Sequence, residues 1–334
     1  MTVTGLGDMV QQFKFARNTT AIKTDLAALA NSLSTGKVQD LARSLGGDTA
    51  RYTHIAYDLS RIDAFQKTAE EVALSLSGKQ SAAKRFDEIR SEIASVLLKV
   101  TDLSNGDQVQ QAANSSSQAF EDMVSVLNSR IADRSLFAGT SVASRATVPA
   151  AEMLNAISAT LLPGATVPDI VQAVTDYFSD PVGGFATTGF LGQTAPGPAQ
   201  RISENRQIAQ TPTAADERFT AALSAAAIAA ISDQIGSISG TERRELLNQA
   251  GEYLHIAADG LTDLRAEIGA SEETVANVLA ELGARRTTLG TARNALEQSD
   301  PFETATELQA VQLQLETHFS AMARLSQLSL LRFL

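Results

Sequence analysis

The sequence predicts a mainly α-helical protein. Its N- and C-terminal thirds are expected to form a long antiparallel helical bundle or coiled coil, which carries a small mixed α/β inserted domain. Narrow apolar stripes with heptad-like spacing lie at both ends of the 334 residues. Aromatic residues make up only 5% of the chain and Trp is absent, a composition suited to long helices with narrow seams. Seven of the eight prolines lie between residues 140 and 213, so the middle of the chain differs from both flanks.

The first element is a helix expected from about residue 7 to residue 33, within an N-terminal assembly segment over residues 1–34. The apolar positions follow one another in steps of four and three after the first, which places them on one narrow stripe: Phe15, Ile22, Leu26, Leu29 and Leu33. The stripe ends at Ser34-Thr35-Gly36, a combination typical of a helix C-terminus.

A helical core domain is expected in two parts. In its first part, residues 48–139, the apolar periodicity predicts one long helix up to about residue 103 and a second helix over about 107–137. The Asn105-Gly106 pair predicts the turn between them. Its second part, residues 214–298, begins with an Ala-rich helix.

In that second part, a helix is expected to start at Thr241 and to run towards Ile268. Ser271 is followed by two acidic residues, which predicts the N-cap of a separate helix. Between the two parts, residues 140–213 are expected to form the inserted domain, with short helices over 152–161 and 167–178 and strands and turns after them. Because the insert leaves the core and returns to it, the flanking helices should meet in space and the insert should be dispensable for the core fold.

The last element is a helix within a C-terminal assembly segment, residues 300–334. Asp300 is a suitable N-cap, and Pro301 fits the first helical position, where its missing N–H is not needed. His318 interrupts the apolar stripe of this helix, with Phe319 beside it. The predicted interface residues of the segment are Leu308, Val311, Leu315, Phe319, Met322, Leu325 and Leu330.

Composition and motifs exclude several classes of function. The net charge of −11 argues against nucleic acid as a partner, since no basic stripe is present to neutralise phosphates. Absence of Cys excludes disulfides and thiolate metal sites. The N-terminal residues show no charged leader followed by an apolar core, and no stretch of about 18 apolar residues occurs, so neither a secretory signal nor membrane insertion is expected.

Catalytic residues are not apparent either. His54, His255 and His318 are far apart in sequence and none belongs to a metal-binding pair, so each is expected on a helix surface or seam. Phosphate-binding and dinucleotide-binding glycine motifs are absent, and the Gly236–Gly240 stretch has Ile where a nucleophile would stand. The sequence therefore predicts a protein that is not an enzyme, with no cofactor and no metal.

Four segments resemble the bacterial flagellin family: Gly5-Leu6-Gly7-Asp8 at the start, LANSLSTGKVQDLARSLGGD after the first stripe, NSRIADRSLFAGTS before the insert, and DPFETATELQAVQLQLETHFSAMARLSQLSLLRFL at the end. Within the family, the small insert and the leucine-rich, aromatic-containing ending are most similar to the junction proteins that link hook and filament, especially those of alphaproteobacteria. The resemblance covers about residues 1–140 and 240–334 and fades in the middle.

This resemblance implies a structural adaptor of the bacterial flagellum, exported by the flagellar type III apparatus and located outside the cell. It implies a ring of copies of the chain, with flagellin on one side and the hook-side junction protein on the other. It further implies that the terminal helices assemble between subunits, and that an export chaperone binds the C-terminal helix before assembly.

Two alternatives stay open. Some flagellins also have small inserts, so a filament flagellin fits the same residues. A secreted helical protein of a type III apparatus, such as a needle-tip or translocator component, is the alternative from another class, although a translocator should carry long apolar segments. The apolar stripes themselves also fit helices that only cover their own core.

Overall fold

The structure is a computed structural model. It describes the backbone of residues 4–193, 199–209, 212–236 and 238–331, and the side chains of the same ranges apart from 4–8, 11–12 and 325–331. The chain divides into two compact units. The terminal unit comprises Met1–Asp63 and Ala284–Leu334, and the central unit comprises Ala64–Gly283. The domain limits expected from the sequence fall at helix breaks, whereas the two units divide within long helices, so the predicted domains stay a prediction.

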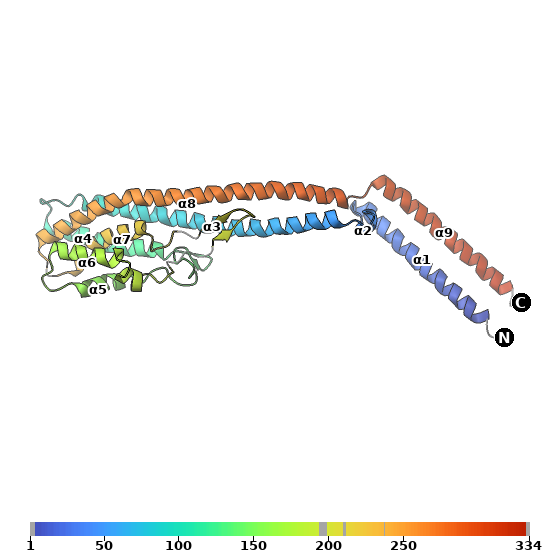
Figure 1. The fold of residues 1–334 in the computed structure, drawn as a ribbon, viewed down its shortest axis with the longest axis horizontal. Helices are drawn as coiled ribbons and strands as arrows, with labels where there is room; N and C mark the ends of the chain where they lie inside the picture. The colour runs from blue at the N-terminus through green and yellow to red at the C-terminus, as the bar shows by residue number, and fades with distance from the viewer. Residues whose placement is uncertain (1–3, 194–198, 210–211, 237, 332–334) are drawn as a thin grey trace. The chain divides into compact units, whose positions relative to one another are not determined.

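The fold is mainly α-helical, as the sequence predicts (Figure 1), and two small antiparallel strand pairs are present among the described residues. The helices are α1 (Thr4–Thr35), α2 (Leu41–Ser44), α3 (Ala50–Leu97), α4 (Gly106–Leu127), α5 (Ala150–Thr160), α6 (Val167–Ser179), α7 (Glu217–Gln234), α8 (Gly240–Glu297) and α9 (Pro301–Leu331). The strands are β1 (Arg130–Ile131), β2 (Arg134–Ser135), β3 (Gln200–Arg201) and β4 (Gln207–Ile208), and a π-helical turn, η1, spans Phe185–Gly189.

Helix α8 corrects one expectation, because the two helices predicted on either side of Ser271 are one continuous helix. Ser271 is not an N-cap: its hydroxyl donates to the carbonyl of Glu267 at 3.1 Å, one turn earlier. A serine bonded in this way is tolerated inside a helix. The buried Ile268 and Val275 lie on the two sides of it, and their packing against the core continues the helix through this point.

The region before the insert corrects another expectation. The helix predicted to reach residue 137 ends at Leu127, and a β-hairpin follows in which Arg130 pairs with Ser135. Its turn residues, Ala132 and Asp133, both have positive φ, 47° and 61°, as a two-residue hairpin turn with the twist of its strands requires. The Cβ of any residue at position 78 would collide with the Ile131 side chain, so Gly78 lets this hairpin pack closely on α3.

Helix α7 forms the centre of the core in the central unit. All of its residues from 222 to 232 are buried, on every side of the helix. Most of these residues are alanines, whose small side chains let α4 and α6 approach closely. At the start of α7, the ring of Phe219 meets Phe86 of α3 and Phe137 edge to face, with ring centroids 5.0 Å and 5.4 Å away.

The insert leaves and re-enters the core at adjacent points, as the sequence predicts. The backbone N–H of Ala214 donates to the carbonyl of Phe137 at 2.9 Å, so the two ends of the insert are hydrogen-bonded to each other. The insert is nevertheless part of the core: α6 packs along α7, and Phe178 meets Phe120 of α4 at a centroid distance of 6.4 Å. The packing of α5 and α6 against one side of α7 argues against the expectation that the insert is dispensable, which stays a prediction.

Candidate assembly interface

Helix α1 ends and helix α9 begins at residues that the sequence predicts to interrupt a helix. Helix α1 ends at Thr35, and Gly36 has a φ of +67° while its N–H donates to the carbonyl of Ser32. This left-handed residue after the last helical turn is the common way to end a helix. Helix α9 begins at Pro301, and the Asp300 carboxylate caps it by accepting hydrogen bonds from the N–H groups of the second and third helical residues, at 2.8 Å and 3.2 Å.

Hydrogen bonds of Glu297, the last residue of α8, hold the segment that follows α1 against the segment that precedes α9. Its carboxylate accepts hydrogen bonds from the Lys37 ammonium and the Tyr52 hydroxyl, both at 3.0 Å, and lies 3.4 Å from the Arg293 guanidinium. The Lys37 hydrogen bond is the main reason that the pKa of Glu297 is lowered, and the hydrogen bond to Glu297 is the main reason that the pKa of Tyr52 is raised. Backbone bonds from Val38 to Glu297 and from Ser299 to Gly36 complete the link.

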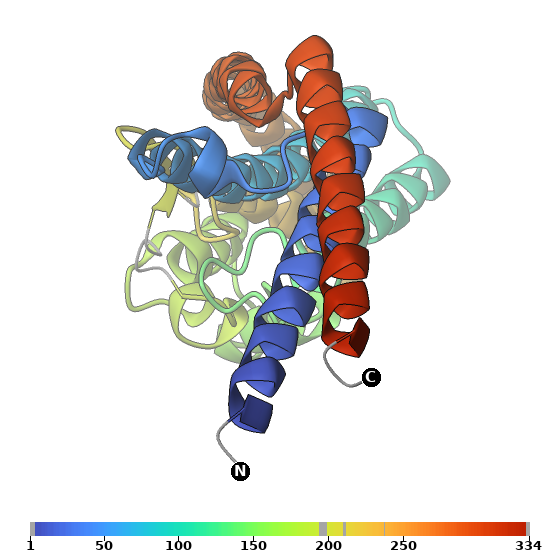
Figure 2. The ribbon, with the colours of Figure 1, turned by 90° about the vertical axis from the view of Figure 1, so that its right-hand side faces the viewer.

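Helices α1 and α9 lie side by side and run antiparallel, so that the start of α1 and the end of α9 lie at the same end of the pair (Figures 1 and 2). The contacts give the direction: Ser32 pairs with Ser299 at one end and Phe15 pairs with His318 at the other. The seam between the two helices consists of side chains that are buried or half-buried: Phe15, Thr19, Ile22, Leu26, Leu29 and Ser32 from α1, and Thr304, Leu308, Val311, Leu315, His318 and Met322 from α9.

One polar cluster interrupts the seam. The Nε2 atom of His318 lies 3.1 Å from the Thr19 hydroxyl and 3.3 Å from the carbonyl of Phe15. The His318 ring also packs against the Phe15 ring, with centroids 5.6 Å apart. His318 is thus a seam residue with a hydrogen-bonding partner on the other helix, consistent with the expectation that the histidines lie on surfaces or seams.

The structure brings most of the predicted interface residues together in this seam and leaves others outside it. Leu33 and Phe319 are 40% and 43% exposed, because Ser32 and His318 occupy the seam next to them. The ammonium of Lys23 lies 5.9 Å from the centre of the Phe319 ring, in a cation–π arrangement. Leu325 and Leu330 lie outside the residues whose side chains the structure describes.

Sequence reasoning missed three apolar side chains that face away from the seam. Met9, Phe13 and Leu313 are 67%, 79% and 65% exposed. They do not fall into the heptad stripe, and a single exposed apolar residue carries no signal in a sequence. Their exposure leaves these side chains available for contact with a second partner.

Leu313 belongs to a shallow groove along the pair. The groove runs between α1 and α9 on one side of the seam and is lined by Asn18, Ala21, Ile22, Asp25, Ala310, Leu313, Gln314, Thr317, His318 and Ala321. Three of these residues are alanines, so a further helix could approach the pair closely here. The polar residues at its margins could supply hydrogen bonds to that helix.

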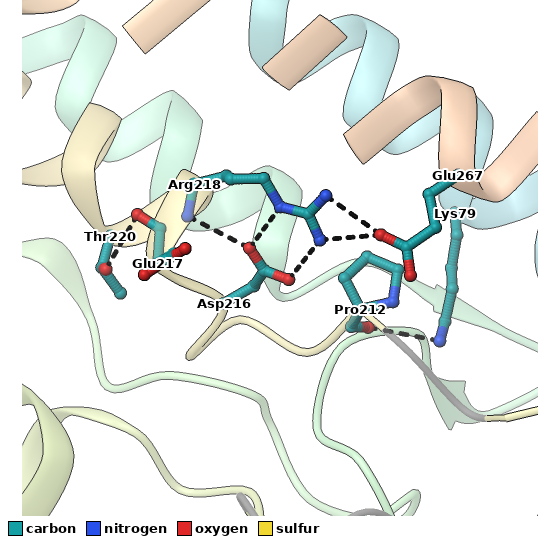
Figure 3. A network of polar contacts seen from close by, with 7 residues as sticks. All are labelled: Lys79, Pro212, Asp216, Glu217, Arg218, Thr220 and Glu267. Carbon is teal, nitrogen blue, oxygen red and sulfur yellow. Dashed lines mark hydrogen bonds and ion pairs between the residues drawn. The ribbon is translucent and has the colours of Figure 1, made fainter. Parts of the chain in front are cut away.

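The central unit holds a second polar network, which fixes the return of the insert onto the core (Figure 3). The Arg218 guanidinium donates to Asp216 at 2.7 Å and to Glu267 of α8 at 3.0 Å, and the hydrogen bond to Asp216 is the main cause of its raised pKa. Nearby, the Lys79 ammonium donates to the carbonyl of Pro212 at 3.3 Å. Both links tie the end of the insert and the start of α7 to long helices of the same unit.

Little in the described part of the chain points to catalysis. His54 contacts Asp58 on its own helix, while His255 is exposed on α8. Among the residues that the structure describes, His, Asp and Glu form no group of three that could hold a metal ion. The described helices also lack the combination of length and apolar character that a membrane span requires.

Comparison with known proteins identifies the C-terminal part of the chain. Residues 252–334 match the family described as the bacterial flagellin C-terminal helical region. By this segment the chain is similar to the flagellins. The match covers α8 from residue 252 onward and all of α9, so one of the two helices of the candidate interface lies within the matched segment. The family resemblance predicted from the sequence is thereby confirmed.

The fold is similar to that of a solved structure described as a flagellar hook-associated protein from Vibrio parahaemolyticus. The TM-score is 0.52, and the likeness covers 74% of this chain and 96% of the other, at 10% sequence identity. So low an identity shows a common fold and does not transfer function. No curated protein matches the sequence.

Proposed function

We propose that this chain is a structural adaptor of the bacterial flagellum, which assembles as a junction ring between hook and filament through its terminal helices. One observation carries the proposal: α1 and α9 pack against each other along a narrow seam, while Met9, Phe13 and Leu313 stay exposed outside it. Most of the stability of a helix in a protein comes from burying an apolar face, and two isolated helices bury only part of theirs. Neighbouring copies would complete that burial.

The occupant we propose for the groove beside Leu313 is a terminal helix of a second copy. Its alanines allow a close approach, and the same surface repeated on every copy would propagate the contact around a ring. The terminal helices would then gain most of their order on assembly, which would make them poorly ordered in the free monomer. In this arrangement flagellin contacts one face of the ring and the hook-side junction protein the other.

The flagellin-like C-terminal segment and the fold similar to that of the Vibrio parahaemolyticus protein support this role. An exposed apolar surface on α9 before assembly would also call for an export chaperone on the C-terminal helix, during export by the flagellar type III apparatus to the cell exterior. The chaperone, the other copies in the ring and flagellin would thus contact the same helix pair at successive stages.

The experiment replaces Leu313 by Asp, with Gln312→Asp as the matched control. Both side chains are exposed on α9, but only Leu313 lines the groove. Burying an unpaired carboxylate costs several kcal/mol, so Leu313→Asp should lower filament attachment at least about 100-fold in a motility and attachment assay. Gln312→Asp should assemble normally, and both monomers should melt like the unchanged protein. Normal attachment by Leu313→Asp would exclude the groove from the interface.

The number of copies separates the junction protein from a filament flagellin, the closest alternative. Quantitative mass spectrometry of purified flagella should find the chain at about a ring's worth of copies per filament if it forms a junction. A filament flagellin would instead dominate the preparation. Absence of the chain from flagella would favour a secreted protein of another type III apparatus.

A further inference from the structure

Charged residues continue both flanks of the groove beside Leu313. On α9 the flank, called the α9 row below, proceeds in helical steps of four and three: Glu303, Glu307, Ala310, Gln314, Thr317, Ala321 and Arg324. On α1 the flank, called the α1 row, has the same steps: Lys14, Asn18, Ala21 and Asp25. Residues at this spacing lie on one face of a helix. The charged residues of both rows are exposed, so they are available to a partner that enters the groove.

The charges of the two rows separate by sign along the groove. Lys14 and Arg324 lie nearer the end of the pair at which α1 starts and α9 ends. The three carboxylates lie nearer the other end: Asp25, Glu303 and Glu307. Among the side chains that the structure describes, only Asp25 of these five has an ion pair, with the Arg43 guanidinium at 3.7 Å. The groove therefore has a basic end and an acidic end, whose charges are mostly left for a partner.

The charged positions of the two rows have a common centre. The midpoint of the α1 row falls beside Thr19, and the midpoint between the acidic and basic ends of the α9 row falls beside Gln314. His318, one turn after Gln314, lies 3.1 Å from the Thr19 hydroxyl, so the two midpoints are within about one helical turn of the same level. A half-turn about an axis across the groove at this level brings each basic end onto an acidic end. The surface is therefore complementary to itself.

We propose that two free chains pair groove to groove about this two-fold axis, so that α1 runs antiparallel to the second copy's α1 and α9 antiparallel to the second copy's α9. The Lys14 ammonium of each copy then faces Asp25 of the second copy. The Arg324 guanidinium faces the second copy's Glu303 and Glu307. Charged side chains beside an apolar helix contact set the orientation of the partner. A parallel pair would place the two basic ends together and the two acidic ends together, and these like charges repel.

Leu313 supplies the apolar centre of this pair. It is 65% exposed and precedes Gln314, next to the axis, so the Leu313 side chains of the two copies meet and cover each other. A two-fold contact of this kind is closed, since it uses the same surface on both copies and cannot extend into a ring. The pair is thus a state of the free chain that covers the groove until assembly. It does not depend on the proposed junction role.

The first experiment measures the association of the full-length chain by sedimentation equilibrium, at about 1–300 µM chain and at two salt concentrations. Exposed ion pairs are individually weak and are screened by salt. We expect a monomer–dimer equilibrium whose dissociation constant rises at least about ten-fold between about 50 mM and 500 mM NaCl. A chain that stays monomeric over this range, or a dimer that salt does not weaken, would overturn the proposal.

Charge reversal tests which ends meet. Arg324→Glu changes two contacts of the symmetric pair from attraction to repulsion, so it should weaken the dimer at least about ten-fold. Adding Glu303→Arg and Glu307→Arg to the same chain should restore the affinity to within about three-fold of the unchanged protein. Arg17→Glu is the matched control, because Arg17 is exposed, lies outside both rows and makes the same change in net charge. A loss that the added arginines do not restore would exclude the proposed alignment.

A disulfide tests the two-fold axis directly, since the chain has no cysteine of its own. The Gln314→Cys chain should form a disulfide-linked dimer under mild oxidation, because its two thiols meet close to the axis. The matched Gln312→Cys chain should stay unlinked, since Gln312 is exposed on the same helix but lies outside the row. Equal linking of both chains would overturn the two-fold pair. A monomeric chain found at a ring's worth of copies in purified flagella would overturn the pair alone, whereas a dimer with restored charges that is absent from flagella would overturn only the junction role.

Discussion

The substitution Gly139→Ala tests how the chain enters the insert. Gly139 has a φ of +63°, and a Cβ at this position would lie 2.5 Å from the backbone oxygen of Gln193. Real Cβ atoms do not approach an oxygen so closely, so either the hairpin or the segment around Gln193 must move. Gly164→Ala is the matched control, because Gly164 has a φ of +85°, lies in the same unit and has no heavy atom near its absent Cβ.

The expected losses in the free energy of unfolding distinguish backbone strain from a steric clash. A left-handed conformation costs a residue with a side chain about 1–2 kcal/mol, and the less flexible unfolded chain returns about 0.4–1 kcal/mol. Gly164→Ala should therefore cost about 0.5–1.5 kcal/mol. The collision at Gly139 adds about 1–3 kcal/mol, as overpacking does elsewhere. Gly139→Ala should then lower the free energy of unfolding by about 2–4 kcal/mol.

Urea unfolding should be followed by circular dichroism together with hydrogen exchange of the α7 amides. The exchange reports the central unit alone, which matters because two compact units need not unfold together. Equal losses for Gly139→Ala and Gly164→Ala would mean that the Gln193 segment moves away at no cost. The close approach would then contribute nothing to the fold, and the reasoning would fail.

Three further predictions concern the hairpin, the Glu297 link and the insert. Ala132→Gly should raise the stability of the central unit by about 0.5–1 kcal/mol in the same urea experiment, because glycine relieves the positive φ of 47°; a loss of stability would contradict the hairpin geometry. Glu297→Gln should lower the melting temperature of the terminal unit at pH 7, and this loss should shrink as the pH is taken below 4.5: the lowered pKa of Glu297 makes its contribution fully present above its ordinary value of 4.5 and lost as the pH falls through the folded-state value. Replacing residues 142–211 by a Gly/Ser linker should expose one side of α7 and abolish the cooperative melt, and a retained sharp transition would show that α4 and α3 suffice.

Periodicity and capping chemistry allowed the terminal helices to be predicted well. The steps of four and three placed Phe15, Ile22 and Leu26 on the face that meets α9, and Asp300-Pro301 marked the start of that helix. These signals are local, because a cap or a stripe depends on residues within two or three turns. They therefore remain readable in a sequence without knowledge of what the helix contacts.

Features that depend on distant contacts could not be predicted in this way. The β1–β2 hairpin turns at Ala132-Asp133, which lacks the Asn-Gly signature of such turns, and its position depends on the space that Gly78 leaves on α3. The continuity of α8 through Ser271 depends on core packing on both sides of that residue. A cavity lined by Lys79, Ser135 and Ile208 joins residues that are more than 50 positions apart, so no local pattern predicts it.

The polar positions of the α1–α9 seam explain how a weakly covered pair can still have one register. Apolar stripes with a regular repeat pack almost equally well after a shift by one heptad, so they do not by themselves specify the alignment. Here Thr19 and His318 meet across the seam at 3.1 Å, and Ser32 accepts a hydrogen bond from Ser299 at its other end. A shift would leave the imidazole facing an apolar side chain without a partner, which costs more than the lost apolar contacts. The seam thus gives up some apolar burial for a fixed alignment of the two chain ends, and that alignment decides which side chains, Leu313 among them, remain outside the seam for a neighbouring subunit.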